Sequence, residues 1–152
     1  MKLRVKDCMS RKIKSILPDM NAGEALKMLI KSGASGLPVI DKLGALKGVF
    51  TEKEVLKAIL PGYLKDVGAF IYSEDSKSEL KKLADLDKFT AQDIMRKDVP
   101  TLDEEASLSE ASHIMLTKSE RRIVVTKNNL PTGVITRCDV VRALAKEAGV
   151  TL

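Results

Sequence analysis

The sequence predicts a mixed α and β fold (α+β): two β-α-β-β-α repeats that pack together as an intramolecular pseudo-two-fold pair. The first observation is a strand-to-helix motif that occurs twice, Gly-Val-Phe-Thr-Glu-Lys-Glu at residues 48–54 and Gly-Val-Ile-Thr-Arg-Cys-Asp at residues 133–139. In both copies apolar residues favour a strand, and the threonine is a preferred N-cap for the helix that follows. The second observation is that the flanking sequence is repeated as well. A sheet of this size with only two helices leaves one face uncovered, so we expect the halves to share a core.

The repeat covers most of both halves of the chain and keeps its order. Matched segments lie 85 or 86 residues apart: 5–9 with 91–95, 13–16 with 99–102, 21–24 with 107–110, and 38–40 with 123–125. We therefore divide the chain into repeat one at residues 1–62, a connecting segment at residues 63–90, and repeat two at residues 91–152.

The elements of repeat one follow from local patterns. Residues 13–16 are expected to form a short strand, and the helix at 22–31 begins after a polar cap and ends at Gly33. Strands at 37–40 and 46–50 form a hairpin, and the next helix starts after Thr51. Pro61 and Gly62 end that helix. Repeat two is expected to follow the same plan.

The connecting segment has no counterpart after repeat two. It carries an apolar cluster at residues 63–72 and a short helical pattern at residues 76–86. A long insertion with aromatic residues is often functional. We favour a role in covering the core of its own chain, and a dimer contact or a lid over a cleft is the alternative.

With these motifs in hand, the chain resembles a tandem pair of cystathionine-β-synthase-type (CBS) domains, called a Bateman module. The resemblance covers residues 5–60 and 91–145. It rests on both Asp-x-Met openings, the Ser-Gly-Leu-Pro-Val run at residues 35–39, and both Gly-x-x-Thr-x-x-acid motifs. The chain departs from the family pattern at Glu54, where Asp is usual, and at residues 120–123, where the second Gly-x-Pro run is replaced by Glu-Arg-Arg-Ile.

The acidic residues of the two motifs, Glu54 and Asp139, differ in how well a helix-capping role alone accounts for them. A Thr-x-x-Glu sequence before an apolar run is a capping box, which is a complete explanation for Thr51 and Glu54. Asp139 is a shorter and less usual partner for Thr136. A carboxylate there can accept both hydroxyls of a ribose, and a helix N-terminus beside it favours phosphate.

The resemblance implies two ligand sites, each combining residues of both repeats. The first would consist of Lys14, Ser15, Ile16, Ser35, Gly36, Leu37, Thr136, Arg137 and Asp139. In it Ile16 and Leu37 would sandwich a base, and Lys14 or Arg137 could reach a phosphate. The second, weaker site would consist of Thr51, Glu54, Val99, Pro100, Thr101, Arg121 and Arg122.

Composition argues against several other classes of function. The net charge of +5 is spread among acidic residues, and only 3% of residues are aromatic, which disfavours a nucleic-acid stacking surface. Cys8 and Cys138 are too few for a disulfide framework, and the single histidine, His113, is expected to face solvent. The sequence has no stretch of 18 apolar residues and no signal-peptide core, so we expect a cytoplasmic protein without a membrane partner.

The sequence therefore favours a non-catalytic regulatory module without a cofactor. Its ligand would be AMP, ADP, ATP or an S-adenosyl compound, bound between the repeats, and we expect a homodimer that signals to an unidentified regulated protein. The alternative is a ligand-free scaffold for protein interaction or redox regulation. In that case the threonine motifs are only helix caps, and Cys138 or the cluster at residues 63–72 carries the function.

Overall fold

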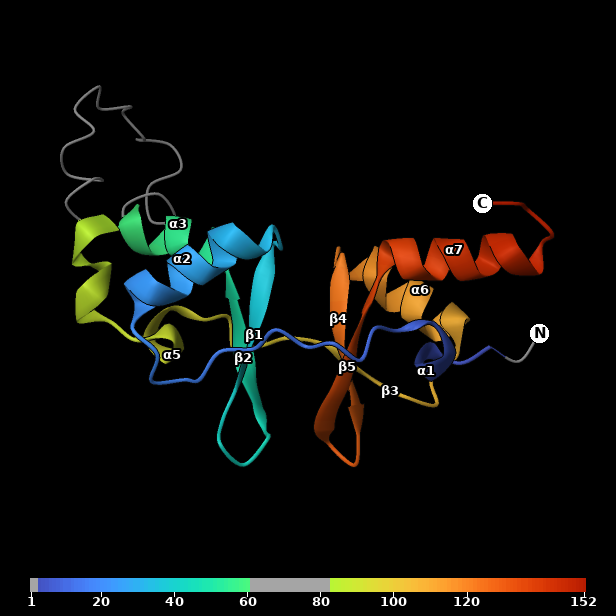
Figure 1. Ribbon diagram of the computed structural model, residues 1–152, viewed down its shortest axis with the longest axis horizontal. Coiled ribbons are helices and arrows are strands. Elements are labelled where there is room, and N and C mark those ends of the chain that lie inside the picture. Colours follow the sequence, from blue (N-terminus) through green and yellow to red (C-terminus); the bar gives the residue numbers. More distant parts are fainter. Residues whose placement is uncertain (1–2, 61–82) are drawn as a thin grey trace, which may run out of the picture. The chain divides into compact units, whose positions relative to one another are not determined.

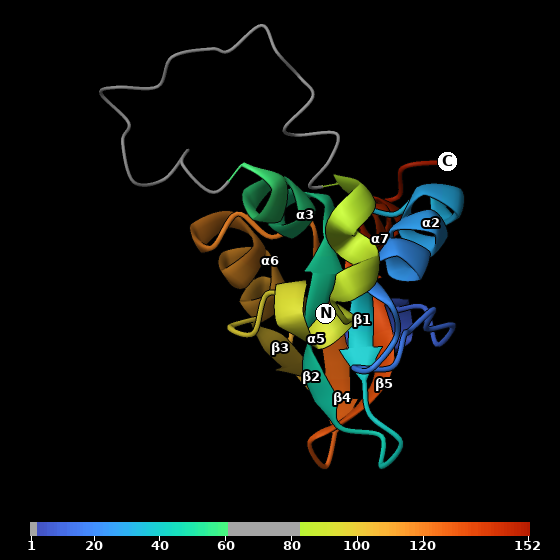
Figure 2. The same ribbon diagram turned by 90° about the vertical axis from the view of Figure 1, so that its left-hand side faces the viewer.

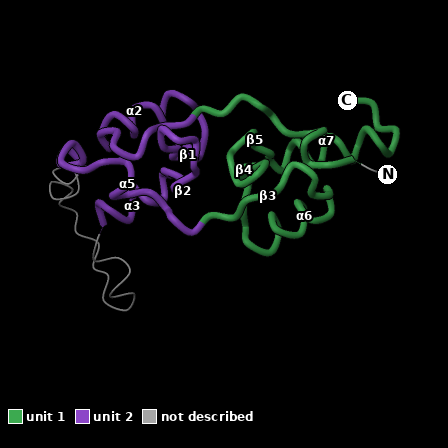
Figure 3. The backbone as a smooth tube through the Cα atoms, turned by 90° about the horizontal axis from the view of Figure 1, so that it is seen from below, with its two compact units in different colours: residues 1–14, 99–152 green, residues 15–98 purple. Residues whose placement is uncertain are grey.

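The computed structural model describes residues 3–60 and 83–152 and confirms the mixed α and β class (Figure 1). The chain forms two compact units (Figure 3): unit 1 contains residues 1–14 and 99–152, and unit 2 contains residues 15–98. The chain thus passes from one unit to the other after Lys14 and again after Asp98. The predicted apolar cluster at 63–72 and most of the helix predicted at 76–86 lie outside the described residues.

Unit 2 is built on an antiparallel hairpin of β1 (Gly36–Ile40) and β2 (Leu46–Thr51). Its other elements are α2 (Ala22–Ser32), α3 (Glu52–Ile59), the 3-10 helix η1 (Asp85–Lys88) and α5 (Ala91–Ile94). The strand predicted at 13–16 is reduced to one parallel bridge between Ile16 and Val39. Figure 2 shows α5 beside β2, and the two elements are in contact.

Unit 1 contains a three-stranded sheet in the order β3-β4-β5. Strand β3 (Thr101–Asp103) is parallel to β4 (Arg122–Lys127), which is antiparallel to β5 (Leu130–Thr136). The helices of this unit are α1 (Val5–Cys8), α6 (Leu108–Thr117) and α7 (Arg137–Glu147). Apart from the reduced first strand, the predicted elements of both repeats are therefore confirmed within one to three residues at their ends.

Capping determines where the helices begin and end. Asn21 Oδ1 accepts the N–H of Glu24 at 3.0 Å, and Ser107 Oγ accepts the N–H of Glu110 at 3.1 Å. Both are predicted polar caps, each followed by a glutamate at the third helical position. Helix α2 ends at Gly33, which has φ 66°, a left-handed conformation that glycine adopts at little cost.

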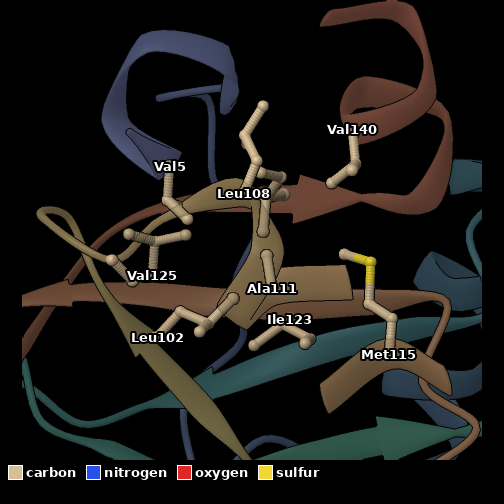
Figure 4. Close-up of a cluster of buried hydrophobic side chains, with 10 residues drawn as sticks. Val5, Leu102, Leu108, Ala111, Met115, Ile123, Val125 and Val140 are labelled. Atoms are coloured by element: carbon tan, nitrogen blue, oxygen red, sulfur yellow. The ribbon is translucent and has the colours of Figure 1, made fainter. Parts of the chain in front are cut away.

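The core of each unit includes a short segment from the start of the other repeat. We call residues 4–11 the first opening segment and residues 90–96 the second. Val5 of the first is fully buried in unit 1 beside Leu108 and Val125 of repeat two (Figure 4). Ala91 of the second is fully buried in unit 2 with residues of repeat one. Sequence repeats and compact units therefore divide the chain differently.

Candidate functional site

Three residues of the first predicted site, Thr136, Arg137 and Asp139, lie where β5 runs into α7 (Figure 1). Thr136 is the N-cap of α7. Its Oγ1 accepts the N–H of Asp139 at 3.1 Å, and its own N–H donates to Asp139 Oδ2 at 2.9 Å. This reciprocal pair is a complete capping box, which fixes the Asp139 side chain at the start of an 11-residue helix.

The second oxygen of Asp139 is held less tightly. Oδ1 lies 3.7 Å from Arg142 Nη1, and the side chain keeps 19% of its surface exposed. A carboxylate oxygen has more than one lone pair, so Asp139 can accept a ligand hydroxyl while Oδ2 remains bonded to Thr136.

The corresponding pair in unit 2 is incomplete. Thr51 Oγ1 accepts the N–H of Glu54 at 3.1 Å, but the Glu54 carboxylate lies by Lys57, with 3.7 Å between Oε1 and Nζ. The structure records the full box for Thr136 and Asp139 and only the threonine's half of it here. The expectation that a capping box explains Glu54 completely and Asp139 only partly is therefore wrong. The shorter Asp139 reaches back to its N-cap, and the longer Glu54 extends to a lysine one turn on.

Strand register places another residue beside each threonine. Gly36 pairs with Thr51 across β1 and β2, and Arg122 pairs with Thr136 across β4 and β5. Directly opposed residues in an antiparallel pair point to the same face. A Cβ on Gly36 would lie 2.9 Å from Val49 Cγ1 and 3.1 Å from Thr51 Cγ2. Gly36 therefore lies too close to Val49 and Thr51 of β2 for a side chain. At the matching position beside Thr136, unit 1 has the exposed Arg122.

Strand register shows which predicted residues lie together within each unit. Arg121 and Arg122, expected in the site of Thr51, lie within unit 1 beside Thr136, and Arg121 O accepts the N–H of Arg137 at 3.0 Å. Gly36, expected in the site of Thr136, lies within unit 2 beside Thr51. Combination of the two half-sites across the repeats stays a prediction.

Arg137 is engaged with main chain in its own unit. Its Nε donates to Glu120 O at 3.0 Å and its Nη2 to Met115 O at 3.3 Å. The guanidinium therefore binds carbonyl groups at and just beyond the end of α6, where a cation is favourable. Because these bonds direct it toward the main chain, Arg121 and Arg122, both exposed, are the better candidates for contact with an anion.

The remaining predicted residues divide by exposure. Lys14, Ser15, Ser35 and Thr101 are exposed, and Val99 and Pro100 are partly buried. Ile16 and Leu37 are buried in the core of unit 2, with 4% and 2% exposure. From the sequence we expected a base to bind between these two side chains. In the structure both side chains instead pack into the core of unit 2.

The cysteines and the histidine lie as the sequence indicates. His113 and Cys138 are exposed, and Cys8 is partly buried against the core of unit 1. Burial, followed by the negative charges of Asp7 and Asp139, raises the pKa of the Cys8 thiol. Cys138 Sγ lies 3.5 Å from Arg142 Nη2.

Sequence reasoning missed one ion pair of unit 1. Glu104 is 6% exposed, the one buried charged residue in the described ranges 3–60 and 83–152, and its Oε1 accepts Arg11 Nη1 at 3.1 Å. Its sequence context, Asp-Glu-Glu between a strand and a helix, is typical of a solvated loop. Only the contact with the first opening segment, 93 residues away in sequence, reveals its burial.

The described residues contain no group of three or more His, Cys, Asp and Glu side chains that could hold a metal ion. Among their helices, none has the length and apolar character needed to cross a membrane.

Comparison with known proteins identifies relatives along the whole chain. A CBS domain-containing protein of Dictyostelium discoideum is 30% identical over 147 residues, which cover 96% of this chain and 94% of the relative. The inosine-5'-monophosphate dehydrogenase of Methanocaldococcus jannaschii is 30% identical over 129 residues, 84% of this chain but 21% of that enzyme. An uncharacterized protein of the same organism is 35% identical over 60 residues, and the match spans 36% of its length.

Solved structures show the same fold. The CBS-pair protein CBSX2 from Arabidopsis thaliana has a TM-score of 0.78 with 21% identity, and the match covers 99% of this chain and 100% of that one. A structure of CBSX2 in complex with AMP has a TM-score of 0.71 with 23% identity, covering 95% and 98% of the two chains. The family model of the CBS domain matches residues 5–61 and again residues 91–146. The chain therefore belongs to the CBS-domain family, as a tandem pair of CBS domains.

Proposed function

We propose that this CBS pair is a non-catalytic regulatory module that binds an adenosyl ligand, AMP, ADP, ATP or an S-adenosyl compound, and passes the binding signal to a partner protein. The observation that carries the proposal is the Asp139 carboxylate: Thr136 fixes its Oδ2 at the N-terminus of α7, and its Oδ1, 3.7 Å from Arg142 Nη1, takes no part in the capping box. The AMP complex of a protein with the same fold supports an adenine nucleotide as the ligand class.

Each group has a separate role in the proposed half-site of unit 1. Asp139 Oδ1 accepts a ribose hydroxyl, a charge-assisted bond that is stronger than a neutral one. The N-terminal end of α7 favours a negatively charged phosphate. Arg122, which faces the same side of the sheet as Thr136, and the neighbouring Arg121 supply positive charge. Lys14, Ser15, Ser35, Gly36 and Leu37 are proposed to complete the first site from repeat one.

We propose that the two sites are unequal. Both carboxylates lie 3.7 Å from a cation one turn on, Asp139 from Arg142 and Glu54 from Lys57. Asp139 is also fixed by the N–H of Thr136, whereas the structure records no such bond for Glu54, so a ligand there must order a longer side chain. The site with Asp139 is therefore the better adenosine binder, and Thr51, Glu54, Val99, Pro100 and Thr101 belong to the weaker one.

A ligand-free scaffold for protein interaction or redox regulation is the second candidate. It is favoured by one specific observation: the complete capping box of Thr136 and Asp139 stabilises α7 without any ligand. In this alternative the exposed Cys138 and the apolar helix surfaces carry the function.

A ligand screen separates the two candidates. Melting curves of the intact chain would be recorded with AMP, ADP, ATP, S-adenosylmethionine and methylthioadenosine, with guanosine and cytidine nucleotides as matched controls. A ligand at about 100 times its Kd raises the free energy of unfolding by about 2.7 kcal/mol. We expect an adenosyl compound to raise the melting temperature and the controls to leave it unchanged. If no adenosyl compound acts at millimolar concentration, the scaffold replaces the sensor.

A further inference from the structure

The Arg11–Glu104 ion pair joins parts of unit 1 that are distant in sequence. Arg11 is the last residue of the first opening segment, and Glu104 directly follows β3. The Arg11 side chain is 61% exposed and the Glu104 side chain only 8% exposed. An exposed pair contributes little to stability, but removal of the cation from a buried carboxylate leaves a charge without compensation.

The surroundings of Glu104 make Arg11 its charged partner at hydrogen-bond distance. Both main-chain groups of Glu104 are hydrogen-bonded. The Glu104 N–H donates to Thr126 O at 2.9 Å, and the Glu104 carbonyl accepts the N–H of Lys6 at 3.0 Å. The Thr132 hydroxyl, although it makes no hydrogen bond of ordinary geometry, then Arg11 and Lys127, lower the pKa of the Glu104 carboxyl and outweigh the opposite effect of burial. Glu104 therefore remains charged near neutral pH, and Arg11 is the positive group bonded to it.

The pair also lies next to both places where the chain passes between the units. Lys14 and Ser15, residues of the proposed first site, follow Arg11 by three and four positions. Val99 to Thr101, residues of the proposed second site, precede Glu104 on the second passage. Residues 12–15, which we call the first passage, have no helix or strand of their own. Ser10 and Ile16, which flank it, are bonded to Val134 in unit 1 and to Pro38 in unit 2.

The residues at the matched positions of unit 2 cannot form the same pair. At the matched positions 86 residues away, Arg11 corresponds to Lys97 and Glu104 to Pro18. The main-chain contacts, in contrast, are present in both units: Ser10 exchanges two N–H···O bonds with Val134, and Arg96 exchanges two with Val49, all at 2.9 Å. The Arg11–Glu104 pair therefore has no counterpart at the matched positions, and the passage beside it leads to the proposed stronger site.

We infer that Arg11 and Glu104 are positioning residues that hold the first passage in place for ligand binding, although neither is proposed to touch the ligand. This inference rests on the proposed function. Without the pair, the first passage samples more conformations, and Lys14 and Ser15 must be ordered when the ligand binds. Substitutions that act through such a contact change coupling by roughly 2-fold to 30-fold.

The test compares four variants of the intact chain. Arg11→Gln and Glu104→Gln remove one charge each, and Arg11→Lys retains the positive charge. Lys6→Gln is the matched control, because it removes a cation from the same opening segment, where Lys6 pairs with the exposed Glu105. Each protein would be titrated calorimetrically with AMP, and hydrogen exchange of the Ser10 and Ile16 amides would be measured without ligand.

We expect Arg11→Gln and Glu104→Gln to weaken AMP binding by roughly 2-fold to 30-fold. Both should accelerate exchange at Ser10, whereas Arg11→Lys and Lys6→Gln stay close to the parent in both measurements. Unchanged exchange in Arg11→Gln would overturn the inference even if no protein binds AMP, and absence of AMP binding by the parent counts against the proposed function alone. Faster exchange with unchanged AMP affinity would overturn the positioning role and leave the pair as a stability contact.

Discussion

Gly133 lies directly against the main-chain oxygen of Ser10. A Cβ at Gly133 would be 2.6 Å from Ser10 O and 2.8 Å from Met9 Sδ. Gly48 faces the second opening segment in the same way, because a Cβ there would overlap Arg96 O. The glycine that starts each strand-to-helix motif is thus the place where the other repeat's opening segment docks.

Gly133→Ala should destabilise unit 1, because overpacking of a well-packed contact costs about 1–3 kcal/mol. Chemical denaturation of the parent and the variant measures the loss in free energy of unfolding. Met9→Ala in the same chain should not restore it, since the nearest atom is the main-chain oxygen of Ser10. An alanine variant as stable as the parent would contradict this docking role.

The compact units predict which fragments fold. Residues 15–98 are contiguous and contain the whole core cluster of unit 2, including Leu86 and Ala91. Residues 1–62 lack both of these residues. The fragment 15–98 should therefore unfold with a sharper transition than the fragment 1–62, which we expect to have no stable monomeric fold. Circular dichroism during thermal unfolding decides this, and a cooperative melt of monomeric 1–62 would contradict it.

Local signals in the sequence predicted most of the fold. The polar caps Asn21 and Ser107, the helix stop at Gly33 and the two hairpins are properties of neighbouring residues, and all are confirmed. The exchange of opening segments was not predicted, because repeated spacing gives the order of the segments and not which unit each one joins. Val5 and Ala91 read as ordinary apolar residues in either repeat.

The site was predicted less completely, for reasons specific to individual residues. Thr136 and Asp139 form the expected helix start, but the register that brings Arg122 beside Thr136 depends on strand pairing. The bonds from Arg137 to the carbonyls of Met115 and Glu120 depend on how α6 ends. Ile16 and Leu37 are apolar residues, and apolar character does not distinguish a base contact from a core contact.

The lowered pKa values predict acid sensitivity. Hydrogen bonds from Thr90 lower the pKa of the Asp93 carboxyl. Thr132 and Arg11 lower the pKa of the Glu104 carboxyl. The folded state therefore binds fewer protons than the unfolded state. The contribution of Glu104 to the free energy of unfolding is fully present above its ordinary pKa of 4.5 and is lost as the pH falls through the lower pKa of the folded state. Denaturation at several pH values should give a shallower loss for Glu104→Gln than for the parent. Glu105→Gln controls for net charge, and equal slopes in all three proteins would contradict the assignment.

Exposed apolar residues at matched positions of the two repeats support the proposed homodimer. They are Ile30 with Leu116, and Leu56 with Val141. Val55 and Val140, on the same two helices as Leu56 and Val141, are core residues with 5% and 4% exposure. Light scattering should give about twice the monomer mass of 16.6 kDa. Val141→Asp should reduce it, whereas Leu130→Asp at the β4–β5 turn should not. A parent of monomer mass at high concentration would contradict the dimer.

Adenosyl binding at Asp139 is tested most directly by calorimetric titration of AMP into the parent, Asp139→Asn and Asp93→Asn. Asp93 closes the same kind of capping box with Thr90 at the start of α5, so its variant controls for loss of the cap. Loss of a charge-assisted hydrogen bond costs about 1.5–3 kcal/mol. We therefore expect Asp139→Asn to weaken AMP binding by roughly 10-fold to 150-fold, and Asp93→Asn to bind like the parent. Equal AMP affinity in all three proteins would contradict the proposal that Asp139 is a ligand residue.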